Sequence, residues 1–212
     1  MTVTDISQIQ PLIEAVDAAD SAPALSGAVR SLAAAQSPAA SPTLITVLGF
    51  NNPGAAVAAV DGLVVLGATA VPALLEQLDG YNYGARAWAI RALALIGDPR
   101  SLTILVETAR GDFALSVRRA AAKGLGSIQW SAMTAAERAI GQQAAIAALK
   151  VAVADPEWVV RYASIVGLEG LAAALQRQGD DIGDLQQVLT TAAQQDLEVV
   201  VQARAQWALA QL

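Results

Sequence analysis

The sequence predicts an all-α protein, a right-handed α-solenoid of stacked helix pairs that forms one domain over residues 1–212. Three observations support this fold class. Six segments repeat one helical pattern, their starts lie 31, 30, 32, 43 and 41 residues apart, and strong helix formers dominate a composition that is 55% hydrophobic but only 4% aromatic. A unit of this length holds two helices and two turns, which is typical of a solenoid with a long curved binding surface.

The repeated pattern places small and apolar residues on one face of each helix. The aligned segments start at Ala24, Ala55, Ala85, Val117, Val160 and Val201. A small residue stands four and seven positions after every start, and a leucine stands eight positions after it, for example Leu63 and Leu168. Because these offsets fall on one side of an α-helix, we expect this side to pack tightly against neighbouring helices.

Turn residues divide the chain into five helix pairs and a last half pair. The predicted helices cover residues 5–17, 25–36, 42–48, 54–66, 70–78, 84–96, 101–110, 115–128, 144–154, 157–176, 185–195 and 197–212. Proline lacks the amide hydrogen that a helix interior needs, so Pro38 and Pro42 mark a loop after the first repeated helix. Turns are also predicted at 51–54, at the helix stop 97–99 and in the polar segment 178–183.

The fourth repeat carries an insertion between Gln129 and about Gly141. Within it, Thr134 and Glu137 have the spacing of a capping box, in which each side chain bonds the backbone amide of the other residue. We therefore expect another helix to begin at this point.

Charged residues recur at fixed positions around the start of each repeated helix. Aspartates precede the start by five or six residues at Asp79, Asp112, Asp155 and Asp196, and arginines follow it by one residue at Arg86, Arg118 and Arg161. Such an aspartate can cap the following helix and pair with an arginine of a neighbouring repeat. This recurrence favours a structural ladder, but the arginines remain candidates for ligand binding because their helix lines the inner wall of a solenoid.

Composition disfavours several classes of function. The chain has neither histidine nor cysteine, so it lacks the usual acid–base group at neutral pH, the commonest metal ligands and disulfides, and we predict no metal site. Its net charge of −6 disfavours nucleic acid as a partner, because phosphates require a basic surface. No apolar run approaches about 20 residues, and residues 1–5 lack the basic and apolar regions of a signal peptide, so we expect neither a membrane span nor a signal peptide.

Aromatic and basic residues crowd into the segment 81–91. It contains Tyr81, Tyr83, Arg86, Trp88 and Arg91, whereas aromatic residues are scarce elsewhere. Arginine can bind a carboxylate through two hydrogen bonds and aromatic rings stack on conjugated planes, so the cluster suits a planar conjugated ligand that bears carboxylates. The alternative interpretation is that Trp88 belongs to the core and that the tyrosines complete a turn.

Residues 81–100, the pair Asp112 and Phe113, and residues 116–126 followed by Trp130 carry a family resemblance. This middle third of the chain closely resembles the E/F-type phycobilin lyases, and most of all their smaller F-type subunits. That family has HEAT-like repeats and occurs in cyanobacteria and red algae. A related subunit that also isomerises the bilin carries a His-Cys motif, and this chain contains neither residue, so the resemblance does not extend to isomerisation.

The resemblance implies a subunit of a heterodimeric bilin lyase. Such an enzyme attaches phycocyanobilin through a thioether to a cysteine of the phycocyanin alpha subunit. The implied partners are a larger E-type subunit, apo-phycocyanin alpha and phycocyanobilin itself, which is a substrate rather than a permanently bound cofactor. The expected location is the cyanobacterial cytosol near phycobilisomes. Because the acceptor protein supplies the thiol, the lyase needs no cysteine of its own.

Seven residues are candidates for bilin binding. They are Tyr81, Tyr83, Arg86, Trp88, Arg91, Arg118 and Arg119. The arginines are expected to bind the two propionates, and the aromatic residues to stack on the rings or hydrogen-bond to them. The sequence does not identify the proton donor, for which an aspartate or a tyrosine is suitable.

Two alternatives to a heterodimeric lyase remain open. One is a non-catalytic solenoid that binds phycobiliproteins during phycobilisome assembly or degradation, where related repeat proteins detach bilins. The other is a lyase that acts as a monomer. The last repeated helix finishes on Trp207, Leu209 and Leu212 without the polar capping repeat that a solenoid requires for solubility, which favours an obligate partner over a monomer.

Overall fold

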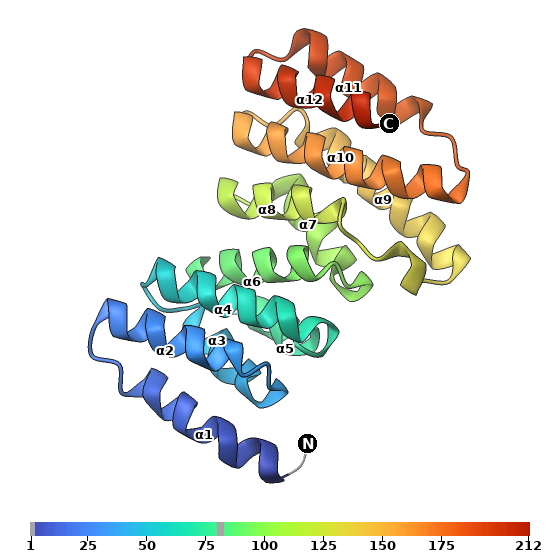
Figure 1. Ribbon diagram of the computed structural model, residues 1–212. Coiled ribbons are helices and arrows are strands. Elements are labelled where there is room, and N and C mark those ends of the chain that lie inside the picture. Colours follow the sequence, from blue (N-terminus) through green and yellow to red (C-terminus); the bar gives the residue numbers. More distant parts are fainter. Residues whose placement is uncertain (1–2, 80–82) are drawn as a thin grey trace. The chain divides into compact units, whose positions relative to one another are not determined.

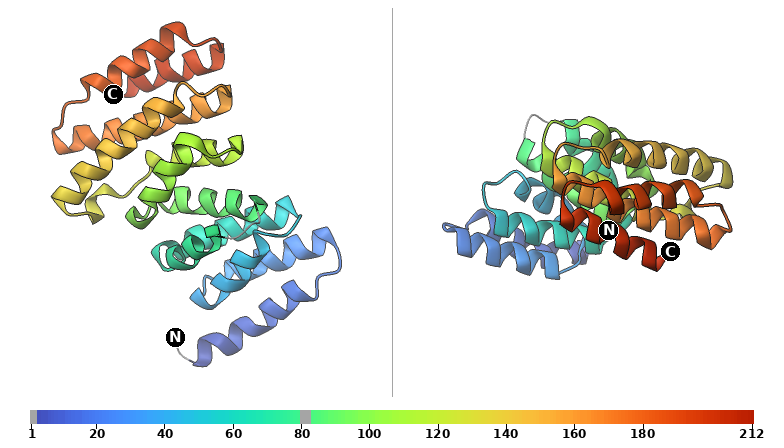
Figure 2. Two further views of the ribbon diagram at one scale, coloured as in Figure 1. Left: turned by 180° about the vertical axis from the view of Figure 1, so that it is seen from behind. Right: turned by 90° about the horizontal axis from the view of Figure 1, so that it is seen from above.

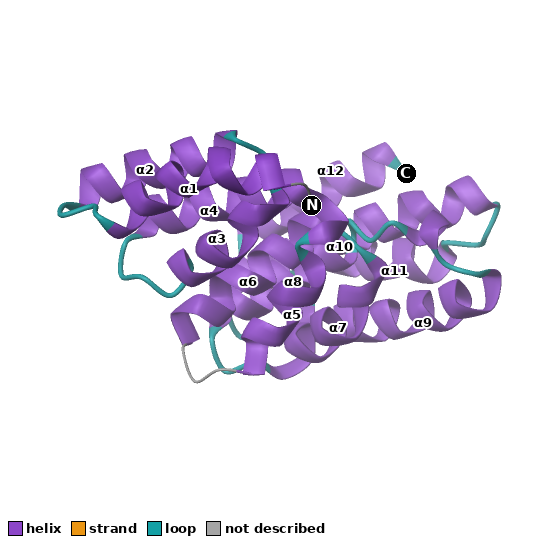
Figure 3. Cartoon of the chain, turned by 90° about the horizontal axis from the view of Figure 1, so that it is seen from below, coloured by secondary structure: helices purple, strands orange, loops and turns teal. Residues whose placement is uncertain are grey.

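The computed structural model describes residues 3–79 and 83–212, and in these residues it contains helices, turns and loops but no strand (Figure 3). The helices group into two compact units, Met1–Ile96 and Gly97–Leu212. The all-α class and the stacking of helix pairs are confirmed. A single domain over residues 1–212 stays a prediction.

The first unit contains six α-helices within its described residues (Figure 1). They are α1 (Val3–Asp17), α2 (Ala22–Ala34), α3 (Ser41–Val47), α4 (Pro53–Leu66), α5 (Val71–Glu76) and α6 (Tyr83–Ile96), with short 3-10 turns η1 (Pro38–Ala40), η2 (Gly67–Thr69) and η3 (Gln77–Asp79). The repeated helices α2, α4 and α6 pack side by side, and α3 packs on both α4 and α5. This arrangement gives two layers of helices, as expected for stacked helix pairs.

The second unit repeats the same plan. Its helices are α7 (Leu102–Gly111), α8 (Leu115–Leu125), α9 (Ala135–Ala152), α10 (Trp158–Gln178), α11 (Gly183–Gln195) and α12 (Val199–Gln211), with 3-10 turns η4 (Pro99–Ser101) and η5 (Trp130–Ala132). The repeated helix α10 lies between α8 and α12, which is also visible from behind (Figure 2). The helices α7, α9 and α11 form the other layer by packing against α8, α10 and α12.

Most predicted helix boundaries lie within two residues of the observed ones, and three helices differ by three residues or more at one end. Helix α2 begins three residues earlier than expected, because Ser21 accepts a hydrogen bond from the amide of Ala24 and so caps the helix. Helix α8 ends at Leu125 rather than Ile128, where Gly124 and Gly126 weaken the helix. The insertion does form the predicted capping box, but the helix that begins there is the single, continuous α9.

Helix α10 is the longest described helix and is apolar enough, by length and composition, to cross a membrane. Its most apolar window has a mean hydropathy of 1.3, and 56% of that window is buried within the protein. It packs against α8, α9 and α12. These contacts identify α10 as the central helix of the second unit.

Close approach of backbones explains the small residues seven positions after each repeat start. A Cβ atom at Gly167 on α10 would lie 2.2 Å from the carbonyl oxygen of Ala122 on α8, and one at Gly62 on α4 would lie 2.7 Å from the Cβ of Ala33 on α2. Real Cβ atoms do not tolerate such distances, since the interior is already close-packed. The small residues therefore set the spacing between repeated helices.

A ladder of charged residues joins successive repeats of the second unit. Nε and Nη2 of Arg118 donate to the two carboxylate oxygens of Asp155 at 2.7 and 3.0 Å, and the same atoms of Arg161 donate to Asp196 at 2.8 and 2.9 Å. The remaining terminal nitrogen of each arginine donates to two backbone carbonyls in the loop before its own helix. Each rung thus binds the loop of one repeat to the aspartate of the next.

The ladder aspartates hold their own loops as well, but not as conventional helix caps. Asp112, Asp155 and Asp196 each accept a hydrogen bond at 2.9 Å from the amide two residues ahead. Those amides belong to the residues at the N-cap positions themselves, Ala114, Glu157 and Glu198. The predicted pairing with arginine is confirmed for Asp155 with Arg118 and for Asp196 with Arg161. The expected capping is corrected to a turn that precedes each helix. The side chain of Asp79 lies outside the described residues.

We expect Gly167→Ala to lower the free energy of unfolding by about 1–3 kcal/mol, because the added methyl group collides with the backbone of α8. The matched control is Gly111→Ala at the end of α7, where a Cβ atom would meet nothing within 4 Å. That substitution should be neutral or stabilising by up to about 1 kcal/mol. Chemical denaturation of both variants is the measurement, and equal effects would contradict the proposed contact.

We expect Asp196→Asn to lower the free energy of unfolding at pH 7 by about 1.5–3 kcal/mol, because Arg161 loses a charged partner in a mostly buried site. Its hydrogen bonds with Arg161 hold the pKa of Asp196 below the ordinary value, although burial opposes this shift. The stabilisation is therefore present above the unfolded-state pKa of about 4 and is lost as pH falls through the lower folded-state pKa.

The pH dependence provides the internal check on this prediction. The melting temperature of the wild type should fall as the pH is lowered below about 4. The melting temperature of the Asp196→Asn variant should fall less over the same range. Asp184→Asn is the control, because its pair with Lys150 is exposed and should contribute at most about 1 kcal/mol. If the stability of Asp196→Asn depended on pH as strongly as that of the wild type, titration of Asp196 would not be the cause of the loss of stability at low pH.

Candidate functional site

The predicted aromatic and basic cluster lies at the start of α6, the last helix of the first unit. Tyr81 falls outside the described residues, as does the side chain of Tyr83, whose backbone begins the helix. Trp88 and Arg91 are three residues apart, and the guanidinium carbon of Arg91 lies 5.5 Å from the centre of the indole ring. Trp88 is half-buried and Arg91 is exposed, so this cation–π pair has access to solvent.

The predicted arginines differ in how far their guanidinium groups are already engaged. Arg86 donates to the carbonyl oxygen of Leu78 at 3.2 Å, a contact that resembles the loop contacts of the ladder arginines. Arg118 makes four hydrogen bonds in the ladder, and its side chain is only 13% exposed. These contacts favour the structural interpretation of Arg118 over carboxylate binding.

Arg119 is the neighbour of Arg118 on α8 and points differently. It is exposed and makes no hydrogen bond or ion pair with any residue that the structure describes. Arg119 therefore keeps a free guanidinium, as a carboxylate-binding residue requires. Because α6 and α8 belong to different units, the predicted residues are described within each unit by itself, Trp88 and Arg91 in the first and Arg119 in the second.

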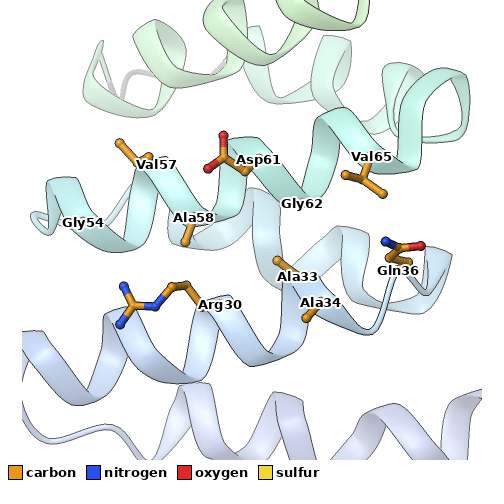
Figure 4. A pocket seen from close by; sticks show the side chains of 10 residues that line it. All are labelled: Arg30, Ala33, Ala34, Gln36, Gly54, Val57, Ala58, Asp61, Gly62 and Val65. Atoms are coloured by element: carbon orange, nitrogen blue, oxygen red, sulfur yellow. The ribbon is translucent and has the colours of Figure 1, made fainter.

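A groove in the first unit lies between α2 and α4 and has a volume of about 420 Å³ (Figure 4). It is lined by Arg30, Ala33, Ala34, Gln36, Gly54, Val57, Ala58, Asp61, Gly62 and Val65. The lining is mostly apolar because seven of its ten residues are alanine, valine or glycine, and small residues let the two helices approach closely at Gly62. Its size lies within the range of about 300–1,000 Å³ found for small-molecule sites.

Three polar side chains interrupt the apolar lining. Arg30 extends from α2 at one end of the groove, Gln36 lies beyond the end of α2 at the other, and Asp61 stands on α4 with its carboxylate turned away from α2 (Figure 4). None of the three side chains has a hydrogen bond or ion pair within the described part of the chain. The backbone of Gln36 has a φ of 51°, a left-handed conformation that is uncommon outside glycine.

Sequence reasoning missed this groove because Arg30 and Asp61 are isolated charges in the linear chain. The repeat alignment contained the signal that identifies them. Both residues stand six positions after their repeat starts, and Arg91 on α6 occupies the same position. Equivalent positions on neighbouring repeats form a row across the stack, so a charged row was predictable.

The surface of the second unit contains an apolar group on and before α12. Leu197 is 92% exposed, Val199 75% and Trp207 54%. The guanidinium carbon of Arg204 lies 4.6 Å from the centre of the Trp207 ring, and Arg204 also pairs with Glu169 on α10. Arg204 thus packs against the ring of Trp207, and more than half of the Trp207 surface stays exposed.

No cluster of three or more metal-ligating side chains occurs among the residues that the structure describes. The described surfaces offer carboxylates, exposed guanidinium and ammonium groups, indole rings, hydroxyls and side-chain amides to a ligand. This set can bind anionic and aromatic molecules and can exchange protons through carboxylates.

Comparison with known proteins identifies the repeats and the family. HEAT repeats match residues 52–126 and 71–169. The chain is 54% identical over 202 residues to the phycocyanin alpha phycocyanobilin lyase CpcF of Synechocystis sp., covering 95% of this chain and 93% of the relative. It is 53% identical over 198 residues to a phycobilisome maturation protein of Synechococcus elongatus, covering 93% of this chain and 94% of that protein.

Solved structures agree with the sequence comparison. A chain of the complex of CpcE and CpcF of phycocyanin lyase from Nostoc sp. superposes with a TM-score of 0.73 at 47% identity, covering 80% of this chain and 98% of that one. A designed armadillo repeat protein, 18% identical with a TM-score of 0.50, shares the solenoid fold over 95% of this chain and 98% of its own. The chain therefore belongs to the phycocyanobilin lyase family of HEAT-repeat proteins and is an F-type member of it.

Proposed function

We propose that this chain is the F-type subunit of a heterodimeric lyase, which attaches phycocyanobilin through a thioether to a cysteine of the phycocyanin alpha subunit. The observation that carries this proposal is the 54% identity with a phycocyanin alpha phycocyanobilin lyase over nearly the whole of both chains. The E-type subunit is the partner, as in the relative solved as a complex of CpcE and CpcF. Phycocyanobilin is the substrate, and we place the reaction in the cyanobacterial cytosol.

The side chains of this protein suit the chemistry of the attachment. The acceptor cysteine adds its S–H across a double bond of a bilin side group, so a C–S bond forms, the proton goes to the bilin and nothing leaves. The lyase needs no thiol for this step, in agreement with the absence of cysteine. Its task is to hold the bilin and orient the reacting group, and orientation alone can supply a large rate factor.

We assign bilin contact to the predicted residues whose side chains remain available. Trp88 offers an aromatic face and Arg91 and Arg119 offer exposed guanidinium groups, whereas Arg118 is engaged in the ladder. Arg86 stays a candidate beside its contact with Leu78, and Tyr81 and Tyr83 stay predictions from the sequence. Propionate binding by the free arginines is supported by the strength of bidentate hydrogen bonds to carboxylate.

We expect Arg91→Ala and Arg119→Ala to slow bilin transfer by about 10- to 100-fold without lowering the melting temperature, since each removes one charge-assisted contact with a propionate. Arg118→Ala should lower the melting temperature as well, because it breaks the ladder. Co-expression with the E-type subunit, the bilin-synthesis enzymes and apo-phycocyanin alpha gives transfer as chromophore fluorescence.

The outcome of this experiment separates binding residues from scaffold. If every substitution that slows transfer also destabilises the fold, the assignment of Arg91 and Arg119 is wrong. If the wild-type pair fails to attach bilin but releases it from chromophorylated phycocyanin, the chain acts in degradation rather than assembly. Arg177→Ala is the control, because this exposed arginine lies in the last turn of α10 and makes no ion pair with any described residue.

We propose that the exposed apolar residues around α12 take part in binding the E-type subunit. Tryptophan is enriched among residues that dominate interface energies, and Trp207 is exposed and packs against the guanidinium group of Arg204. Leu197 and Val199 extend this apolar surface at the other end of α12.

We expect Trp207→Ala to weaken association with the E-type subunit by about 2–4 kcal/mol, because the complex would lose a tryptophan that becomes buried in the interface. Ile140→Ala on α9 is the matched control, since Ile140 is 74% exposed but belongs to another surface, and it should leave the affinity within about 0.5 kcal/mol of the wild type. Calorimetric titration measures both. Equal affinities for Trp207→Ala and wild type would exclude α12 from the interface.

A further inference from the structure

We propose that the groove between α2 and α4 binds the bilin, with Arg30 holding a propionate and Asp61 accepting hydrogen bonds from pyrrole N–H groups. This inference rests on the proposed function, because the ligand is the substrate of the lyase. It adds a contact surface that the predicted residues on α6 and α8 do not include. The groove residues all belong to the first unit.

The shape of the groove suits an elongated apolar ligand. Ala33, Ala34 and Ala58 leave room that larger side chains would fill, and the partly exposed Val57 and Val65 form apolar edges on α4. Arg30 and Gln36 lie six residues apart on and just beyond α2, which corresponds to about 9 Å along a helix axis. A ligand in the groove therefore meets a cation at one end, apolar groups along its body and an amide at the other end (Figure 4).

The charges of the groove complement an open-chain tetrapyrrole. Such a ligand carries two propionate carboxylates at its edge and N–H donors at its centre, so it needs both a cation and an acceptor. Arg30 and Asp61 supply these groups, and neither is paired with another described residue. Two opposite charges that line one groove without pairing are both available to a ligand, because no internal contact has to be broken first.

The groove continues toward the predicted residues of α6. Helix α4 packs against both α2 and α6, and Arg30, Asp61 and Arg91 occupy the same repeat position on these three helices. Neighbouring helix axes lie about 8–10 Å apart, so an elongated ligand that begins at Arg30 can extend past Asp61 to Trp88 and Arg91. Figure 4 shows the Asp61 carboxylate turned away from α2, so a ligand in the groove reaches it where the ligand passes over α4.

The test is direct binding of phycocyanobilin to the purified heterodimer in the absence of acceptor protein, followed by bilin absorbance and fluorescence. We expect Arg30→Ala to raise Kd by about 10- to 100-fold through loss of a charge-assisted contact. Ala34→Leu, which places a larger side chain in the groove, should weaken binding similarly. Asp61→Asn should shift the absorption maximum of the bound bilin to shorter wavelength, because a carboxylate favours the protonated tetrapyrrole.

Matched controls come from the second unit, which does not contain the groove. Arg177→Ala and Asp180→Asn remove an exposed arginine and an exposed aspartate that have no side-chain partner in the described structure, and both should retain the wild-type Kd and spectrum. Circular dichroism confirms folding of each variant. Should Arg30→Ala fold poorly, Arg30→Gln and Ala34→Leu test the same contact and the same space.

The outcomes distinguish this inference from the proposed function. If the wild-type heterodimer binds and transfers bilin while Arg30→Ala and Ala34→Leu keep the wild-type Kd, the groove is not the binding site, although the lyase assignment stands. If the wild-type heterodimer neither binds nor transfers bilin, the proposed function fails and this inference fails with it. Weakened binding in both groove variants with unchanged controls supports the groove.

Discussion

The pairing of each ladder arginine with the aspartate of the following repeat fixes how the second unit is stacked. Arg118 and Arg161 each use all three nitrogens of the guanidinium group, two on a carboxylate and one on the loop before their own helix. A planar group bound on two sides can hold two loops at one distance and one angle. The close backbone contact at Gly167 then sets the spacing of the helices between those loops.

The position of an arginine in the repeat determines whether its guanidinium group is bound in the ladder or available to a ligand. Arginines one position after a repeat start turn toward the loops and are engaged there. Basic residues at the second and sixth positions, such as Arg119, Arg30 and Arg91, turn toward solvent and make no ion pair with described residues. Two arginines that are adjacent in sequence, Arg118 and Arg119, thus have different roles because consecutive residues point about 100° apart around a helix.

Much of the fold was predictable because local rules and packing agree. The repeated small residues and leucines located the helices, Thr134 and Glu137 located α9, and the recurring charges indicated the ladder before its distances were known. The groove was not predictable from local pattern, since its volume depends on how closely α2 and α4 pack at Gly62. The exposure of Trp207 likewise depends on which neighbours cover α12, and residue type alone gives no information on that.

The loops of this protein differ in how much length variation they can accept. Loops that lead into the repeated helices α8, α10 and α12 carry the ladder, so an added residue there would separate an arginine from its carboxylate. Among the described residues, the connections that leave α8 and α10 carry no rung, and the one after α8 already holds the insertion with η5. The loop at 179–182 leaves α10 through the left-handed Gly179, and its exposed part lies at Asp180 and Asp181, before the buried Ile182. A fluorophore-bearing peptide placed there would label the protein while the stack of repeats keeps its register.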